Sequence, residues 1–133
     1  MIGRLEKTVL DCPDPRLLAR FYAQVLGMQV VEDDDDWVVI GRATGWRELA
    51  FQRAKPWTPP TWPEGQVPQQ AHLDVRVTDV EEAERAVLGL GASAGGRRDD
   101  ARGFRVYLDP AGHPFCLVFG GAAMETRPQF SHH

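Results

Sequence analysis

The clearest pattern along the chain is an alternation of apolar and polar residues that leads into a helical stripe, and it occurs twice. The first copy is "KTVLDCPDP", which starts at Lys7, and the second is "HLDVRVTDV", which starts at His72, 65 positions later. In each copy, apolar residues at every second position predict a β-strand of about six residues. The repeat therefore predicts two similar halves within one chain.

A helix is predicted directly after each of these two strands. Asp14 is suited to the N-cap of the first helix, with Pro15 at the first helical position and Gly27 at the end of the apolar stripe. In the second half, Asp79 takes the N-cap position and Glu82 completes a capping box. Each half is thus expected to begin with a strand and a helix.

Three further strands are predicted in each half. They are "MQVVE", "WVVIG" and "RELAFQ" after the first helix, with the four aspartates at 33–36 as a solvated hairpin turn. After the second helix they are a short "ASA", then "GFRVYL" and "HPFCLVF", with "GGRRDDAR" and "DPAG" as turns. The tail from Gly120 onward lacks periodicity.

These elements predict an α+β fold made of two βαβββ modules, at about residues 4–53 and 69–119, in a single domain that covers residues 1–133. The modules are joined by a connector, 54–68, whose five prolines exclude a helix or a central strand there.

Composition and charge exclude several classes of partner. The formal net charge is −4 and the basic residues are scattered, so we expect no nucleic-acid partner. No stretch approaches the roughly 18 apolar residues that span a bilayer, and the N-terminus lacks the apolar run of a signal peptide. We therefore expect a cytoplasmic protein with no membrane partner. Cys12 and Cys116 are far apart in the sequence and are not expected to form a disulfide.

Three segments resemble the vicinal oxygen chelate superfamily, which includes glyoxalase I, extradiol dioxygenases, fosfomycin resistance proteins and bleomycin resistance proteins. They are "LDCPDPRLLARFYAQVLGMQV" at 10–30, "HLDVRVTDVEEAERAVLGLGA" at 72–92 and "DPAGHPFCLVF" at 109–119. The resemblance implies a glyoxalase/bleomycin resistance fold, in which each module curls a mixed sheet into a cup with its helix on the convex side. It also implies that two chains often pair, so a homodimer is expected.

The period-two alternation assigns the residues of the two leading strands to faces. The residues expected under the helices are Thr8, Leu10, Cys12, Leu73, Val75 and Val77, and those expected in the cup are Lys7, Val9, Asp11, His72, Asp74 and Arg76. Two interpretations of the charged cup residues are open. They could form a structural network, with Lys7 paired to Asp11 and Arg76 to Asp74, or they could contact a ligand directly.

The resemblance implies four positions at which metal-dependent members hold a divalent ion, on the first and last strand of each half. In this sequence these positions are occupied by Lys7, His72, Gln52 (or Glu48 on the same face) and Cys116. An ammonium group at Lys7 would repel a cation, so we predict no intrinsic metal. If a metal such as zinc is bound, the expected ligands are His72, Glu48, Gln52 and Cys116.

We therefore predict a small-molecule binding protein of the glyoxalase/bleomycin-resistance type with a small organic ligand. The predicted ligand-binding residues are Lys7, Asp11, Gln52, His72, Asp74, Arg76 and Cys116, with tryptophans, including Trp57 and Trp62 of the connector, and Phe51 or Phe115 as walls. The alternative is a metal-dependent lyase, isomerase or dioxygenase that uses His72 with Glu48 or Gln52 and Cys116. A thiolate–imidazole pair of Cys116 and His72 is a further option.

Overall fold

The same succession of elements occurs twice in the computed structural model, which describes residues 1–43, 45–62 and 64–120. The first module contains β1 (Thr8–Cys12), α1 (Pro15–Leu26), β2 (Gln29–Asp33), β3 (Trp37–Gly41) and β4 (Leu49–Arg53). The second contains β5 (Leu73–Arg76), α2 (Val80–Gly89), β6 (Ser93–Asp99), β7 (Phe104–Leu108) and β8 (Pro114–Val118). The aperiodic tail beyond Gly120 lies outside the described residues.

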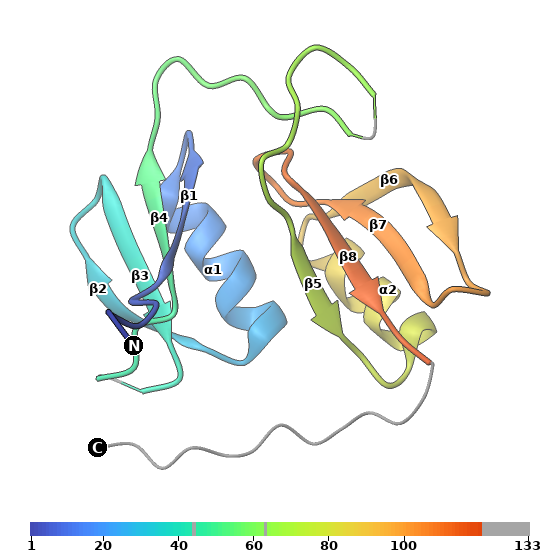
Figure 1. Cartoon of the computed structure of the whole chain (residues 1–133), viewed down its shortest axis with the longest axis horizontal. Coiled ribbons are helices and arrows are strands. Elements are labelled where there is room, and N and C mark those ends of the chain that lie inside the picture. The colour runs from blue at the N-terminus through green and yellow to red at the C-terminus, as the bar shows by residue number, and fades with distance from the viewer. Residues whose placement is uncertain (44, 63, 121–133) are drawn as a thin grey trace.

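Each module forms a four-stranded mixed sheet with one helix, as the sequence predicted. The strand orders are β1-β4-β3-β2 and β5-β8-β7-β6, with the first strand parallel to the last and the other pairs antiparallel. Figure 1 shows the two modules side by side, with the connector spanning between them. None of the helices in the described ranges has the length and apolar character needed to cross a bilayer.

The helix signals read from the sequence are confirmed. The Asp14 side chain accepts a hydrogen bond from the backbone N–H of Leu17 at 3.2 Å, and α1 ends at Gly27, which has a φ of 67°. The Asp79 side chain accepts from the backbone N–H of Glu82 at 3.1 Å. Both caps satisfy N–H groups that have no partner within the helix.

The run of four aspartates forms the turn between β2 and β3, as predicted. Two arginines from neighbouring elements offset the repulsion among these carboxylates. Arg16 of α1 pairs with Asp33 at 2.9 Å, and Arg53 of β4 pairs with Asp36 at 2.5 Å. The aspartates of this turn are therefore ion-paired to α1 and β4 of the first module.

The prediction of a short strand and a loop over residues 92–102 is wrong in part, because β6 extends to Asp99. Its register against β7 shifts between Ala94 and Arg98, so the strand continues through a bulge. Glycine is required there because a Cβ on Gly95 would lie 2.7 Å from Val106. The sequence "GGRR" thus marks a bulged strand rather than its end.

One buried apolar cluster extends through both modules. The predicted inward residues Cys12 and Val75 belong to it, and Leu10, Leu73 and Val77 pack against it. Both cysteines are free thiols, as expected.

The helix α1 contacts both sheets. On the second sheet, the Phe115 ring of β8 lies 5.8 Å from the ring of Phe21 and 6.1 Å from that of Tyr22. Burial of Phe115, which is fully inaccessible, contributes roughly 1.5–3 kcal/mol. The second sheet is therefore anchored to the first through α1.

A buried polar network at this junction centres on Asp109. Its carboxylate accepts hydrogen bonds from the Tyr22 hydroxyl at 2.7 Å and from the backbone N–H groups of Ala111 and His113 at 2.9 and 3.0 Å. Burial, together with the charge of Asp109, raises the pKa of Tyr22, so this hydroxyl keeps its proton. The turn between β7 and β8 is thereby fixed to α1.

The His113 ring completes the junction from the same turn. Its Nδ1 lies 2.9 Å from the Asp109 carboxylate, and its Nε2 lies 2.7 Å from the backbone oxygen of Asp11 in β1. Both partners accept hydrogen bonds, so both ring nitrogens carry protons when both bonds form. Burial of the ring opposes its charge, but Asp109 and the Asp11 carbonyl outweigh burial and raise the pKa of His113.

The free energy of unfolding should depend on the protonation of His113. Because the folded-state pKa is raised above the unfolded value of about 6.5, the contribution is complete below that pH and is lost as pH rises through the folded-state pKa. We expect the free energy of unfolding measured in urea to decrease as pH rises through this window, and no corresponding decrease in His113→Gln. Equal pH slopes for the two proteins would contradict a charged His113.

Candidate ligand-binding site

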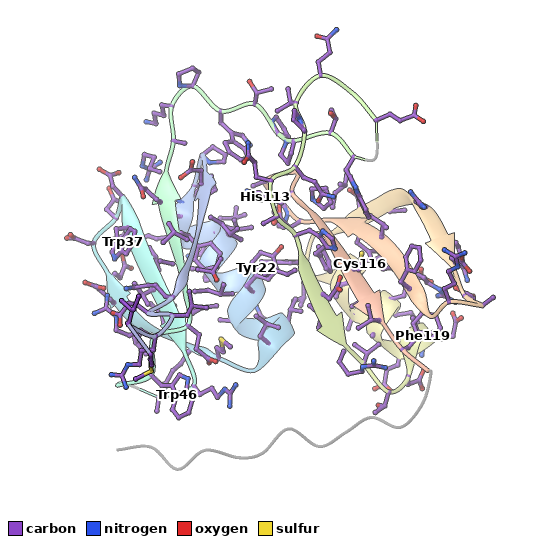
Figure 2. The ribbon with its side chains drawn as sticks, viewed as in Figure 1. Tyr22, Trp37, Trp46, His113, Cys116 and Phe119 are labelled. Atoms are coloured by element: carbon purple, nitrogen blue, oxygen red, sulfur yellow. The ribbon has the colours of Figure 1, made fainter. Side chains whose placement is uncertain are left out.

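The polar face of the second sheet forms a hollow of about 500 Å³, within the range of small-molecule sites. We call it the second-module hollow. Its lining residues are Trp62, His72, Asp74, Arg76, Arg102, Gly103, Phe104, Cys116, Val118, Phe119 and Gly120. Figure 2 shows Cys116 and Phe119 in this module. Four of the seven predicted ligand-binding residues therefore lie together here.

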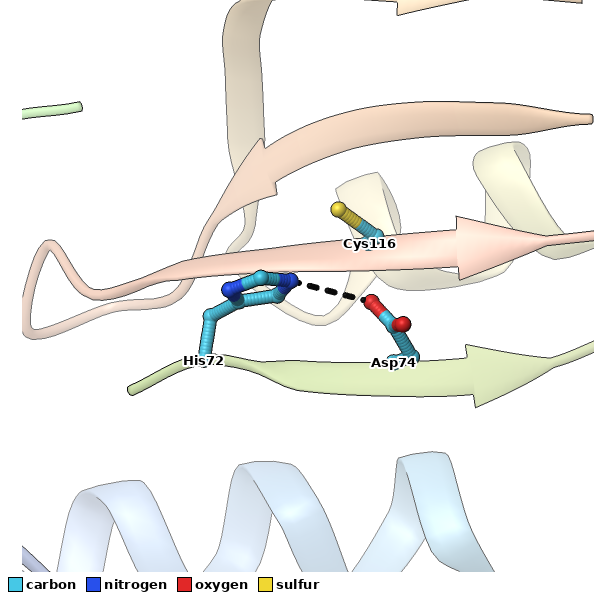
Figure 3. Close-up of side chains that lie close together, drawn as sticks. All are labelled: His72, Asp74 and Cys116. Carbon is cyan, nitrogen blue, oxygen red and sulfur yellow. Dashed lines mark hydrogen bonds and ion pairs between the residues drawn. The ribbon is translucent and has the colours of Figure 1, made fainter. Parts of the chain in front are cut away.

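Strand pairing brings three of these side chains close together. β5 runs parallel to β8 with Asp74 opposite Cys116, and His72 comes two residues before Asp74 on the same face. The His72 Nε2 lies 3.1 Å from the Asp74 carboxylate, and the ligand atoms of His72, Asp74 and Cys116 all lie within 4.8 Å of one another (Figure 3). All three residues of this cluster belong to the second module.

An aromatic platform borders the cluster. The Trp62 ring of the connector stacks on the His72 ring with a centroid distance of 5.1 Å and an interplanar angle of 26°. The Arg97 guanidinium lies 5.9 Å from the ring centroids of both Trp62 and Phe104. Trp62 thus reaches the hollow, as expected of a connector tryptophan.

The other connector tryptophan lies at the module junction instead. Trp57 packs on the His113 ring with a centroid distance of 5.0 Å and donates a hydrogen bond to the backbone oxygen of Ala111 at 2.9 Å. It therefore supports the junction rather than the hollow.

The remaining predicted residues lie in the first module. Gln52 lines a separate hollow of about 430 Å³ with Asp36, Trp37, Arg53 and Lys55, and the two hollows share no lining residue. The Lys7 ammonium lies 5.9 Å from the centre of the Trp37 ring. Asp11 lies in register with Gln52 on the neighbouring strand. The structure therefore divides the predicted site between two sheets.

The predicted charge network is wrong in its pairings. Lys7 pairs with Glu6 at 3.1 Å. It does not pair with Asp11, because residues four apart on an extended segment are roughly 13 Å apart. Asp74 pairs with His72, and the Arg76 guanidinium donates to the backbone oxygen of Gly120 at 2.9 Å.

The phenylalanines expected as walls lie on the wrong face. Phe51 and Phe115 are fully buried in the core under the helices. The walls are instead Phe104, Val118 and Phe119, together with Arg102, which the sequence reasoning missed. The alternation along β8 predicts these positions. Phe115 adjoins Cys116 and must face the opposite side of the sheet, whereas Val118 must lie on the same face as Cys116.

The Cys116 thiol is not poised as a nucleophile. Burial and the neighbouring Asp74 carboxylate raise the pKa of Cys116 to about 11, and only 3% of the residue is exposed. A reactive cysteine needs the opposite, a lowered pKa and access. The arrangement disfavours the thiolate–imidazole option.

The four metal positions implied by the resemblance are not brought together in one chain. Lys7 and Gln52 lie in the first module, and Glu48 is bound to Arg42 at 3.1 Å. Within one chain the structure groups His72 and Cys116 with Asp74, and it places Gln52 in a separate hollow. An imidazole, a carboxylate and a thiol form a donor set that suits zinc once the thiol loses its proton.

Solved structures with similar folds cover nearly the whole chain. A glyoxalase/bleomycin resistance protein/dioxygenase family enzyme from Burkholderia phytofirmans has a TM-score of 0.66 at 17% identity, with 88% of this chain and 98% of that chain covered. The fosfomycin resistance protein FosX from Listeria monocytogenes has a TM-score of 0.66 at 16% sequence identity, with 92% of this chain and 97% of that chain covered. A protein from Agrobacterium tumefaciens has a TM-score of 0.65 at 21% sequence identity, with 91% of this chain and 100% of that chain covered. At these identities the likeness shows the fold alone.

Sequence comparison identifies the family. No functionally curated protein matches the chain. A family model described as a glyoxalase-like domain matches residues 7–118, which includes both modules and the connector. Together with the paired βαβββ modules, this match shows that the chain belongs to the glyoxalase-like domain family.

Proposed function

We propose that this protein binds a small organic ligand with a planar aromatic group in the second-module hollow. The observation that carries the proposal is the stack of Trp62 on His72 at the side of a hollow of about 500 Å³. An aromatic face that borders a concave surface offers a stacking partner to a planar ligand. The hollow has the volume for one or two fused rings.

The polar groups of the hollow fit binding better than catalysis. The Asp74 carboxylate is occupied by His72, and the Cys116 thiol is protonated and nearly inaccessible. The arginines of the lining, Arg76 and Arg102, offer hydrogen-bond donors to a ligand, whereas Phe104 and Val118 offer apolar contact. The described solved relatives include a fosfomycin resistance protein, which is consistent with a small molecule as ligand.

We also propose that the chain forms a homodimer. In it, the hollow of one copy that is lined by Gln52 and Trp37, which we call the first-module hollow, faces the second-module hollow of the other copy. Such pairing would bring Lys7 and Gln52 beside His72 and Cys116, which one chain keeps apart. Val9, an apolar residue on the open face of β1, is 41% exposed and would be covered.

Removal of Trp62 should weaken ligand binding. In titrations with a panel of planar bicyclic compounds followed by calorimetry, we expect Trp62→Ala to raise Kd by about threefold to tenfold, because one ring stack is lost. Trp46→Ala, a first-module control, should leave Kd unchanged. Equal affinities of Trp62→Ala and the wild type for every compound that binds would refute the proposed site.

Sedimentation analysis should show a dimer of the 14.9 kDa chain. Val9→Lys should shift the equilibrium toward monomer, because it places a charge in the proposed interface. Val30→Lys is the matched control, since Val30 is 43% exposed on an outer strand. A wild type that stays monomeric at all concentrations would exclude this assembly.

The second candidate function is zinc binding at the His72–Asp74–Cys116 cluster, favoured by the mutual distances of its ligand atoms. Three protein ligands leave an open position, which is the arrangement that a lyase or isomerase of the vicinal oxygen chelate superfamily would need. Zinc would have to displace the proton of Cys116, so its binding should strengthen as pH rises.

Elemental analysis of protein purified without chelators tests this candidate. Zinc in a 1:1 ratio that is lost in His72→Ala and retained in His113→Ala, a histidine outside the cluster, would support it. Metal-free wild-type protein that also fails to take up added zinc would exclude it.

A further inference from the structure

The second-module hollow is polarised along β5, and its two ends differ in chemistry. His72 and Arg76 lie on the same face of one extended segment, four residues apart, which places them roughly 13 Å apart. Trp62 stacks at the His72 end. Arg76 pairs in register with Val118, which in turn pairs with Phe104, so the other end combines a cation with an apolar floor.

The charges of the hollow do not balance. Its lining contains two arginines, Arg76 and Arg102, and one carboxylate, Asp74. That carboxylate lies at 3.1 Å from His72 and pairs with it. Arg102 pairs with Asp99 at 3.7 Å, and Arg97, outside the lining, lies at the Trp62 ring. Arg76 is therefore the lining arginine that pairs with no carboxylate among the described residues.

Arg76 has hydrogen-bonding capacity that the described part of the chain does not use. Its guanidinium donates to one neutral acceptor, the backbone oxygen of Gly120, and no carboxylate among the described residues forms an ion pair with it. Arg102, whose side chain is 82% exposed, also borders the hollow, but it is paired with the Asp99 carboxylate at 3.7 Å. A guanidinium with free donors and an apolar surround is a strong binding partner for a carboxylate.

We infer that the ligand is an elongated aromatic acid, with its ring system on the Trp62–His72 platform and its anionic group at Arg76. This inference rests on the proposed function and adds the charge and the direction of the ligand. Phe104 and Val118, in register beside Arg76, would contact the apolar part of the ligand next to its anionic group. A cationic ligand of the same shape is disfavoured by Arg76 and Arg102, and Asp74 is already engaged by His72.

Three compounds of matched shape test the inference: 2-naphthoate, 2-naphthylmethanol and 2-naphthylmethylammonium. They are titrated by calorimetry into the full chain treated with EDTA, so that bound metal does not contribute. We expect 2-naphthoate to bind about tenfold more tightly than either of the others, because a charged hydrogen bond to Arg76 is made only by the acid. Its affinity should fall with added salt.

Arg76→Gln should raise the Kd of 2-naphthoate by about tenfold. It should change the Kd of 2-naphthylmethanol by less than about twofold. Arg85→Gln, at an exposed arginine of α2, is the matched control and should bind all three compounds like the wild type. Unchanged unfolding curves for both variants establish that the fold is retained.

The outcomes separate the two levels of the account. If 2-naphthylmethanol binds as tightly as 2-naphthoate and Trp62→Ala weakens both, the anionic ligand is refuted and the aromatic hollow stands. If the acid keeps its advantage in Arg76→Gln, the assignment of Arg76 is refuted. If none of the three compounds binds, the inference is refuted, and the proposed function is then judged by the wider panel of planar compounds.

Discussion

The buried carboxylate of Asp109 ties together three parts of the structure on which the hollow depends. It accepts hydrogen bonds from Tyr22 of α1, from two backbone N–H groups of its own turn and from the His113 ring, which also reaches β1. A buried charge that loses its partners costs several kcal/mol, so the turn and α1 are held in one arrangement. Because β8 begins at Pro114, directly after this turn, the network also sets the register in which Cys116 faces Asp74.

The alternation within β8 then divides structure from function along a single strand. Phe115 and Leu117 face the helices and join the core of both modules, whereas Cys116 and Val118 face the second-module hollow. A slip of one residue would exchange these roles, so the stability of the core enforces the composition of the hollow. The same constraint keeps the Cys116 thiol beside Asp74, where it stays protonated and serves as a wall.

The fold was largely predictable because its signals are local. Asp14, Asp79 and the repeated alternation predict the helix starts and the two leading strands, and the structure bears them out. The length of β6 was missed because its glycines resemble a turn, and only contact with Val106 shows that Gly95 belongs to a strand.

The candidate site was less predictable because it depends on which strands and turns meet. The sequence grouped Lys7 and Gln52 with His72, but they lie on a different sheet. Arg102 comes from a turn and Phe119 from beyond the last strand, so no periodic pattern places them in the hollow. Phe115 adjoins Cys116 in β8, so the period of two by itself places the Phe115 ring in the core and not in the wall of the hollow.

The most direct test of the account is a ¹H–¹⁵N NMR titration of the protein with 2-naphthoate, with the tryptophan indole signals assigned. We expect the signals of the Trp62 indole and of the β5 and β8 amides to shift in a saturable way, and the Trp46 indole signal in the first module to stay unchanged. Saturable shifts confined to the first module, at Trp37 and Gln52, would contradict the claim that the second-module hollow is the binding site.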